Sequence, residues 1–350
     1  MTITRSIYDT ATLLGVMREL EPVQSFWLDL AFPGVINFSD EYIDFSKITE
    51  TRKIAPLVMP TSQGKPIYGQ AEKVYRFRPA YVKVKDAVNP QTMIRRKAGL
   101  GELLLPTALD PMSRFDATVG EIMRQHRDAI ARRWEWLAAQ AILNGTVTLS
   151  GDDYPTTTID FERDSGHTIT KGVATRWGDA GISIVEDIET WSALMRNAKF
   201  GGAPTKLIVG SDVWPVMKAD DEIKELLRTD LRQTSGTSFN FGPRDGLQVE
   251  FMGRISQNLE VWVYSDYYED TSGTAVPFMD SRDVVLIGPN VQGVKCFGAI
   301  LDKAANLSPL AVFPKMWDQE DPSATQIMTQ SAPLMVPVNP NATLKARVLA

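Results

Sequence analysis

The chain has 350 residues and a net charge of −6, with 43% hydrophobic and 23% charged residues. These proportions exclude a largely disordered protein, and the acidic balance argues against a dedicated nucleic-acid-binding protein, whose surface would be basic. No apolar run reaches the roughly 18 residues that a membrane-spanning helix needs, so we expect no contact with a membrane.

Residues 1–49 predict an acidic arm with little regular structure. Three basic residues stand against seven acidic ones, which gives this segment a net charge of −4. A short helix is expected within 10–20, and Phe26, Trp27 and Phe32 follow in a segment rich in large apolar side chains. Such side chains need a surface to cover them. We expect that surface to belong to a neighbouring subunit.

Residues 50–97 are basic, with eleven Lys or Arg against three acidic residues and a net charge of +8. Apolar and polar residues alternate over 51–60 and 72–85, the period of β-strands, and a turn rich in Gly and Pro lies between them. This long hairpin has too little apolar surface to fold alone, so we expect it to lie on an acidic surface of another subunit. A solvated hairpin at the edge of its own domain stays an open alternative. The residues expected to make the intersubunit contact are Arg52, Lys53, Lys65, Lys73, Arg76, Arg78, Lys83 and Lys85.

A long amphipathic helix is predicted over 116–143, and the rest of the chain is organised around it. Ser113 and Asp116 resemble a capping box at its start, and Asn144-Gly145 is a typical stop. At about 1.5 Å per residue this helix would be about 42 Å long, well above the usual three or four turns. Apolar residues recur every three or four positions on one face. The predicted core residues of this face are Val119, Met123, Ile130, Trp134 and Leu137.

The sequence beyond this helix alternates predicted strands and helices. A strand pair is expected over 146–161, a helix over 185–198 and a short buried strand over 206–210. Further apolar strands between 247 and 301 read as one sheet. The pattern predicts an α+β fold with a compact αβ lobe in the second half of the chain.

The sequence lacks the short motifs that carry common chemistry. We find no phosphate-binding loop, dinucleotide fingerprint, zinc-binding pattern or nucleophile elbow. His126 falls on the inner face of the long helix and His167 in a polar turn, so both are interpreted as structural residues. Cys296 is interpreted as a small buried hydrophobic residue. We therefore predict no catalytic residue, no cofactor and no metal site.

Clusters of carboxylates are the remaining candidates for catalysis. Adjacent residues in the sequence need not have the separation that acid–base chemistry requires, so a carboxylate-dependent hydrolase is the weakest of the functions considered. Such an enzyme would also leave the basic hairpin unexplained. The clusters are Asp152-Asp153, Asp220-Asp221-Glu222 and Glu269-Asp270.

Three stretches resemble the major capsid proteins of lambda-like tailed bacteriophages. They are YVKVKDAVNPQTMIRR at 81–96, Trp177 with the DIETW run at 187–191, and above all FPKMWDQEDPSATQIMTQSAPLM at 313–335. The resemblance runs from about residue 75 to the C-terminus. It implies the Hong Kong 97-type capsid fold. The implied domains are an N-terminal arm (1–49), an extended β-hairpin loop (50–100), a peripheral domain with the spine helix (101–175 and 313–350) and an αβ axial domain (176–312).

The resemblance also implies a structural function without enzymatic activity. Such proteins assemble into hexamers and pentamers of an icosahedral shell that encloses packaged double-stranded DNA without sequence-specific binding. The implied partners are further copies of the chain, a separate scaffold protein, a decoration protein at three-fold positions, which pairs strands with edges of the arm and extended loop, and a portal at one vertex. Assembly in the cytoplasm of the bacterial host would fit the single cysteine and the lack of a signal-peptide segment.

Two further possibilities follow from the same resemblance. A nanocompartment shell protein of the same fold is the main alternative function, although the phage-like string at 313–335 disfavours it. Some relatives lock their shells with Lys–Asn cross-links, for which Lys65 with Asn339 or Asn341 would be the partners here. Because the lambda-like branch relies on decoration instead, we regard such a cross-link as the weaker expectation.

Overall fold

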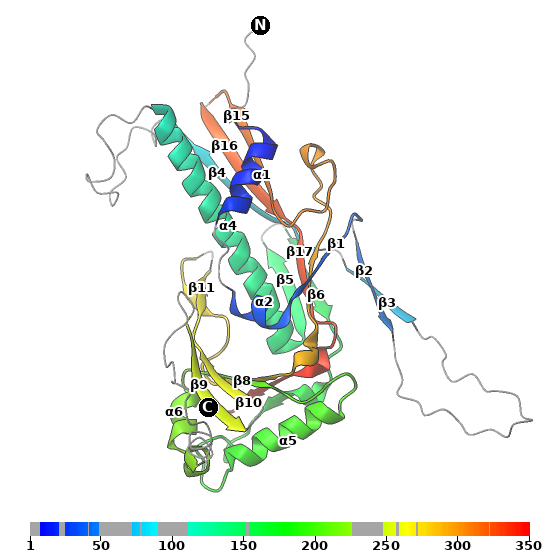
Figure 1. Cartoon of the computed structure of the whole chain (residues 1–350), viewed down its shortest axis with the longest axis vertical. Helices are drawn as coiled ribbons and strands as arrows, with labels where there is room; N and C mark the ends of the chain where they lie inside the picture. Colours follow the sequence, from blue (N-terminus) through cyan, green and yellow to red (C-terminus); the bar gives the residue numbers. More distant parts are fainter. Residues whose placement is uncertain are drawn as a thin grey trace, which may run out of the picture.

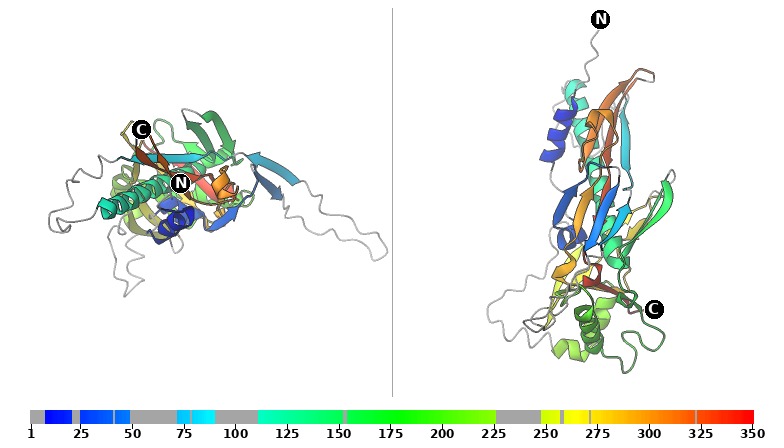
Figure 2. Two further views of the ribbon diagram at one scale, coloured as in Figure 1. Left: turned by 90° about the horizontal axis from the view of Figure 1, so that it is seen from above. Right: turned by 90° about the vertical axis from the view of Figure 1, so that its right-hand side faces the viewer.

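The computed structural model describes residues 8–20, 25–40, 42–48, 72–77, 79–89, 111–151, 154–225, 248–256, 259–270, 272–321 and 323–350. The molecule is elongated (Figures 1 and 2), with a long helix and a narrow sheet at one end and a compact lobe of strands and helices at the other. The first helix, α1, lies at the narrow end, whereas the C-terminus lies in the compact lobe.

The long helix α4 spans Pro111–Asn144, which is 34 residues or about 50 Å. The predicted start at Asp116 was wrong, because a proline is well tolerated at the first position of a helix, where its missing amide would be unpaired in any case. The end agrees with the prediction to within one residue. Gly145 follows with a φ of +67° and donates its amide to the Ala141 carbonyl at 3.1 Å. This left-handed glycine is a common way to end a helix.

Helices α4 and α1 (Thr10–Glu19) pack on one face of a three-stranded antiparallel sheet. Its order is β15 (Phe313–Gln319), β16 (Ala324–Ser331) and β4 (Val82–Val88). Alternate residues of the strands point towards the helices. The core between them contains Leu13, Met17, Val88, Phe115, Val119, Met123 and Ile327.

The first part of the arm packs on its own chain. Helix α2 (Phe26–Ala31) lies against α4, and Trp27 and Phe32 are fully buried in the main core. Strand β1 (Gly34–Asn37) then pairs in parallel with β14 (Val294–Phe297), which pairs in antiparallel with β17 (Pro333–Val336). The expectation that a neighbouring subunit covers the aromatic residues of the arm is therefore wrong for Trp27 and Phe32.

The residues of the predicted second hairpin strand, 72–85, are divided between two sheets. Strand β3 (Glu72–Phe77) pairs in antiparallel with β2 (Ile43–Ile48), and β4 joins the sheet beside α4. The β2–β3 pair thus includes residues that were assigned to the arm, whereas the predicted partner strand 51–60 is not among the described residues. Residues 49–71 and 90–110 lie outside the described part of the chain.

A six-stranded mixed sheet forms the compact lobe, and α5 (Ile184–Asn197) and α6 (Val213–Ala219) pack against it. The strand order is β7 (Thr168–Thr170), β18 (Thr343–Arg347), β13 (Asp283–Ile287), β8 (Lys206–Gly210), β10 (Leu259–Tyr264) and β9 (Val249–Ser256). The expected domain division differs here from the structure, because it places 313–350 together in the peripheral domain. Strand β18 lies instead between β7 and β13, where Leu344 and Ala346 fill the core of the lobe.

Two-stranded pairs and single helical turns complete the described elements. The pairs are β5 (Thr146–Gly151) with β6 (Tyr154–Asp160), and β11 (Tyr267–Glu269) with β12 (Ala275–Pro277). The single turns are η1 (Ser165–His167), η2 (Pro289–Val291), η3 (Lys303–Ala305) and η4 (Pro340–Ala342).

Truncation of a buried residue of α4 should test how strongly the helix is held. Ile130 is fully buried, so Ile130→Ala is expected to lower the free energy of unfolding by about 2–5 kcal/mol through lost burial and a residual cavity. Gln125→Ala, an exposed position of the same helix, should change it by less than about 0.5 kcal/mol. Denaturant unfolding of the subunit followed by tryptophan fluorescence measures both. Similar values for the two variants would contradict the packing described.

Candidate functional site

The predicted core residues of α4 lie where the helix meets the sheets. Val119, Met123, Ile130 and Leu137 are each at most 4% exposed. Trp134 is partly buried, its indole nitrogen donates to Ser331 Oγ at 3.3 Å, and its ring centre lies 5.1 Å from that of Phe297. Helix α4 therefore connects the β15–β16–β4 sheet to the β1–β14–β17 sheet.

His126 joins α4 to two strands of the neighbouring sheet. Its Nδ1 lies 2.9 Å from Oγ1 of Thr329 on β16, and its Nε2 lies 2.9 Å from a carboxylate oxygen of Asp86 on β4. Because a carboxylate only accepts, Nε2 donates to Asp86, and the threonine hydroxyl is a suitable partner for Nδ1 because it can both donate and accept. Both ring nitrogens are occupied by groups of the same chain, which supports a structural role.

A buried carboxylate on α4 holds the N-terminus of the arm helix α2. Glu135 is 4% exposed and accepts hydrogen bonds from the backbone amides of Trp27 at 2.6 Å and Leu28 at 3.1 Å. A helix leaves such amides unpaired in its first turn. Burial raises the pKa of Glu135 to about 7, against the effect of the two amides, and the nearby carboxylates of Asp266 and Asp29 add to the rise. The contact between arm and spine helix therefore contains a group that titrates near neutral pH.

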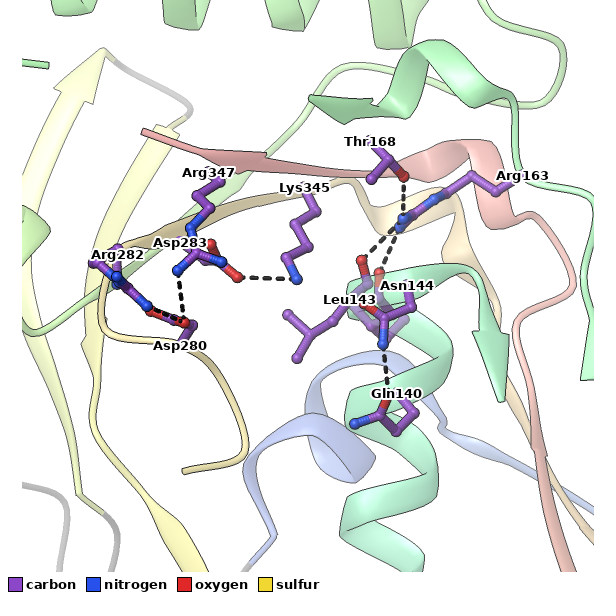
Figure 3. Close-up of polar contacts among 11 residues, drawn as sticks. Gln140, Leu143, Asn144, Arg163, Thr168, Asp280, Arg282, Asp283, Lys345 and Arg347 are labelled. Carbon is purple, nitrogen blue, oxygen red and sulfur yellow. Dashed lines mark hydrogen bonds and ion pairs between the residues drawn. The ribbon is translucent and has the colours of Figure 1, made fainter. Parts of the chain in front are cut away.

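A partly buried guanidinium closes the C-terminal end of α4 (Figure 3). Arg163 donates to the carbonyl oxygens of Ile142 at 2.7 Å and Leu143 at 2.9 Å, and to Oγ1 of Thr168 at 2.7 Å. Carbonyl groups at a helix end lack partners within the helix, and the helix dipole favours a cation there. Burial lowers the pKa of Arg163 to about 10, so the group remains charged at neutral pH. A side chain on Gly145 would place its Cβ 2.8 Å from that of Arg163.

Charged pairs fix the strand β18 beside β13 near the same helix end (Figure 3). The Lys345 ammonium lies 2.9 Å from a carboxylate oxygen of Asp283, which is almost fully buried. Asp280 accepts from Arg282 at 2.9 Å and from Arg347 at 3.0 Å. The hydrogen bond from the Arg282 guanidinium is the main reason why the pKa of Asp280 falls to about 2. Arg163 therefore connects the end of the spine helix to the lobe, and the charged pairs fix the strand β18 within the lobe.

The basic residues predicted to contact a neighbour are described only in part. Arg52, Lys53, Lys65 and Arg78 lie outside the described residues, and Lys73 is described in its backbone only, as part of β3. The guanidinium of Arg76, on the same strand, lies 5.7 Å from the ring centre of Tyr42.

Lys83 and Lys85 form a basic patch on β4, which we call the lysine patch. Both side chains are exposed on the face of the sheet opposite α4. Their ammonium groups lie 5.8 Å from the ring centre of Tyr81 and 5.3 Å from that of Trp317. A cation over an aromatic face is attracted to it, so these two charges have preferred positions on the surface.

The carboxylates of the cluster 220–222 all make structural contacts. Asp220 accepts from the Ile223 amide at 3.0 Å, Asp221 pairs with Lys224 at 2.7 Å, and Glu222 accepts from the Ser183 hydroxyl at 2.9 Å. Asp152 and Asp153 lie outside the described residues. Among the described residues, no group of three or more His, Cys, Asp or Glu side chains is arranged to hold a metal ion.

The other candidates for chemistry are buried in the protein. His167 is 1% exposed and donates from Nδ1 to the Thr343 carbonyl at 2.9 Å, and burial lowers its pKa. Burial also raises the pKa of the Cys296 thiol to about 12, which keeps it protonated. No helix in the described part of the chain is both long enough and apolar enough to cross a membrane.

Glu135 and Arg163 were not predicted from the sequence. A charged residue inside or after an amphipathic helix is most often solvated, and nothing local distinguishes these two. The partner of Glu135 is the amide of Trp27, 108 residues away. Only the fold brings such groups together.

Comparisons with known proteins identify relatives over almost the whole chain. Residues 9–348 match the family described as phage major capsid protein E. The major capsid protein of Escherichia phage lambda is 28% identical over 341 residues, covering 96% of this chain and 97% of that protein. The major capsid protein of Enterobacteria phage P21 is 28% identical over 344 residues, with the same coverage. A prophage capsid protein from Escherichia coli CFT073 has a similar structure, with a TM-score of 0.73 at 22% identity over 98% of this chain and 99% of that one.

The chain belongs to the phage major capsid protein E family. It has the α+β Hong Kong 97-type capsid fold, and it is a structural component of the virion rather than an enzyme, as its relatives are. The predicted family, fold class and structural function are thus confirmed.

Glu135→Gln should remove the loss of subunit stability that Glu135 causes as the pH rises from about 5 to 8. The raised pKa means that the folded chain binds this proton more tightly than the unfolded chain. The resulting stabilisation is full below about pH 4.5 and is lost as the pH rises through 7, an effect on the order of 3 kcal/mol. Urea unfolding at several pH values measures it. Glu189→Gln, at an exposed position, should keep the wild-type profile, whereas a wild-type profile for Glu135→Gln would exclude the proposed titration.

Arg163→Met should destabilise the subunit by on the order of 3 kcal/mol, because it leaves two buried carbonyl groups unpaired. Arg163→Lys should recover part of this loss by restoring one charged donor. Asn144→Ala changes an exposed neighbour at the same helix end and should cost less than about 0.5 kcal/mol. Denaturant unfolding compares the three variants. A stability of Arg163→Met equal to that of Asn144→Ala would show that the guanidinium does not hold this end.

Proposed function

We propose that copies of this chain assemble into the hexamers and pentamers of an icosahedral shell that encloses packaged double-stranded DNA. The match to the major capsid family over residues 9–348 carries the proposal. The elongated subunit and the exposed lysine patch support it, since both suit a protein whose surfaces meet copies of itself. Assembly would take place in the cytoplasm of the bacterial host.

The proposed domains follow the division expected for this fold, with one change. They are the arm (1–49), the extended loop (50–100), the peripheral domain around α4 (101–175 and part of 313–350) and the axial domain (176–312). Strand β18 is grouped with the axial domain, since it pairs with β13. The proposed partners are a separate scaffold protein, a decoration protein at three-fold positions and a portal at one vertex. These partners rest on the family resemblance.

Opposite charges on different parts of the subunit support an electrostatic contribution to assembly. Residues 50–97 carry a net charge of +8, so the remainder of the chain carries −14. We propose that the lysine patch and Arg76 contact acidic surface of a neighbouring copy. Attraction between exposed charges is screened over about 10 Å at 0.1 M salt, so assembly should weaken as salt is added. The acidic balance also suits a DNA container, because a strongly basic interior would bind phosphate groups.

Negative-stain electron microscopy of the chain, expressed alone and with its candidate scaffold, tests the proposed function. Closed shells or rings of five and six subunits are expected. A monodisperse monomer in both samples, indifferent to scaffold and salt, would exclude assembly into a shell.

Reversal of the lysine patch tests the electrostatic contribution. The double variant Lys83→Glu/Lys85→Glu should lower the fraction of assembled subunits, most clearly at low salt, while the melting temperature of the free subunit stays within a few degrees of wild type. Lys218→Glu, at an exposed position of α6 in the compact lobe, should assemble like wild type. Sedimentation velocity measures the assembled fraction. Wild-type yields from the double variant would contradict the proposed contact.

A further inference from the structure

Half of the exposed large apolar side chains of the described residues lie on β1 or on the loop that follows β14. Eight such residues are exposed, and the four in this region are Val35, Ile36, Leu301 and Leu307. The other four, Tyr42, Val173, Tyr267 and Val338, lie elsewhere. Single exposed apolar residues are normal, but a group of them in one place indicates an interaction surface.

Strand β1 is an open edge of this sheet. Within the described chain, β14 is the only strand paired with it. The amides of Gly34 and Phe38 donate towards β14, at 3.3 and 2.8 Å, so the alternation of the strand directs the amides of Val35 and Asn37 outward. Val35 and Ile36 point to opposite faces, yet their side chains are 58% and 45% exposed.

Two other edge strands, β15 and β4, carry residues that discourage pairing with another chain. Strand β15 contains Pro314 and Lys315, and β4 contains Lys83 and Lys85. Lysine and proline are common means of protecting an edge. Strand β1 reads Gly-Val-Ile-Asn, with neither a charge nor a proline. Its sequence fits an edge that another chain covers.

The loop 299–309 continues this surface, because it leaves β14 at the end where β1 also ends (Figure 1). A β-bridge joins its two ends. Asp302 accepts from the Ala304 amide at 2.9 Å and pairs with Lys315 at 3.0 Å, which fixes the loop to β15. Leu301 and Leu307 project from this fixed loop, 50% and 56% exposed.

The backbone of the loop is strained at one of these leucines. Asn306 and Leu307 have φ values of +50° and +55°. Asparagine tolerates this left-handed conformation, whereas the Cβ of a leucine is crowded by the following carbonyl group. Strain of this kind persists where the surrounding structure enforces it, most often at functional positions. A side chain held in a fixed exposed position also loses less entropy when a partner binds.

We propose that β1 and the loop 299–309 form one docking surface for a second copy of this chain. The second copy pairs with the outer edge of β1 and covers Val35, Ile36, Leu301 and Leu307. This inference rests on the proposed assembly into a shell, in which each copy is surrounded by other copies. The edge of β1 carries no charge, which favours an apolar protein surface over the phosphates of DNA as its partner.

Hydrogen exchange of wild-type protein locates the docking surface. Amides in 34–38 and 300–308 should exchange at least about tenfold more slowly in assembled shells than in free subunits. Wild-type shells without this protection would overturn the proposed surface and leave the shell function intact. Protection that appears only after another phage protein is added would also overturn it, because the occupant would then not be a second copy.

The variant Leu307→Asn should weaken docking of a second copy without destabilising the folded subunit. Asparagine prefers the left-handed backbone found here, so the free subunit should be at least as stable as wild type, while the concentration needed for assembly should rise by about tenfold. Val35→Lys/Ile36→Lys should have the same effect on assembly by charging the edge. Val173→Lys, at a position 83% exposed in the compact lobe, should assemble like wild type. Normal assembly of the first two variants, or an equal loss in the third, would overturn the proposal.

Discussion

The last carbonyl groups of α4 lie inside the protein, and the arrangement of the whole subunit depends on how they are paired. Arg163 supplies both hydrogen bonds to them and a third to Thr168, at the start of the lobe. Gly145 makes this contact possible, because any side chain there would meet that of Arg163. Together with the apolar core that Ile142 and Leu143 share with Val285 and Ile287, Arg163 and Gly145 hold the end of the spine helix on the compact lobe.

At two places in the subunit a charged side chain pairs with the end of a helix, and the two charges are opposite. We call these places the two joints. Arg163 meets the negative end of the helix α4, whereas Glu135 meets the positive end of the helix α2. A buried charge is costly unless its hydrogen bonds are well made, so each joint favours one geometry over nearby ones. The guanidinium remains charged at neutral pH, whereas the carboxylate titrates there. The joint to the arm is therefore the more readily altered of the two.

Sequence patterns within a segment predicted the helices and strands. Which of them pack or pair together depends on contacts between distant segments. The spacing of Val119, Met123 and Ile130 predicts the buried face of α4, and Gly145 predicts its end. The earlier start at Pro111 was missed, because the apolar period is weak in the first turns. The partner of β3 and the position of β18 could not be predicted, since both depend on strands distant in the sequence. The role of Glu135 could not be predicted either, because its partner Trp27 is 108 residues away in the sequence.

The position of β18 has a consequence for the order of events during synthesis. Strand β18 lies between β7 and β13 in the six-stranded sheet, yet it is translated after every other strand of that sheet. Chains fold as they emerge from the ribosome, beginning with the N-terminal parts. Until β18 emerges, β7 lacks its partner and β13 leaves one of its edges unpaired. The compact lobe therefore cannot be completed on a nascent chain that still lacks this strand, and an incomplete chain would leave an edge of β13 open to pairing with other chains.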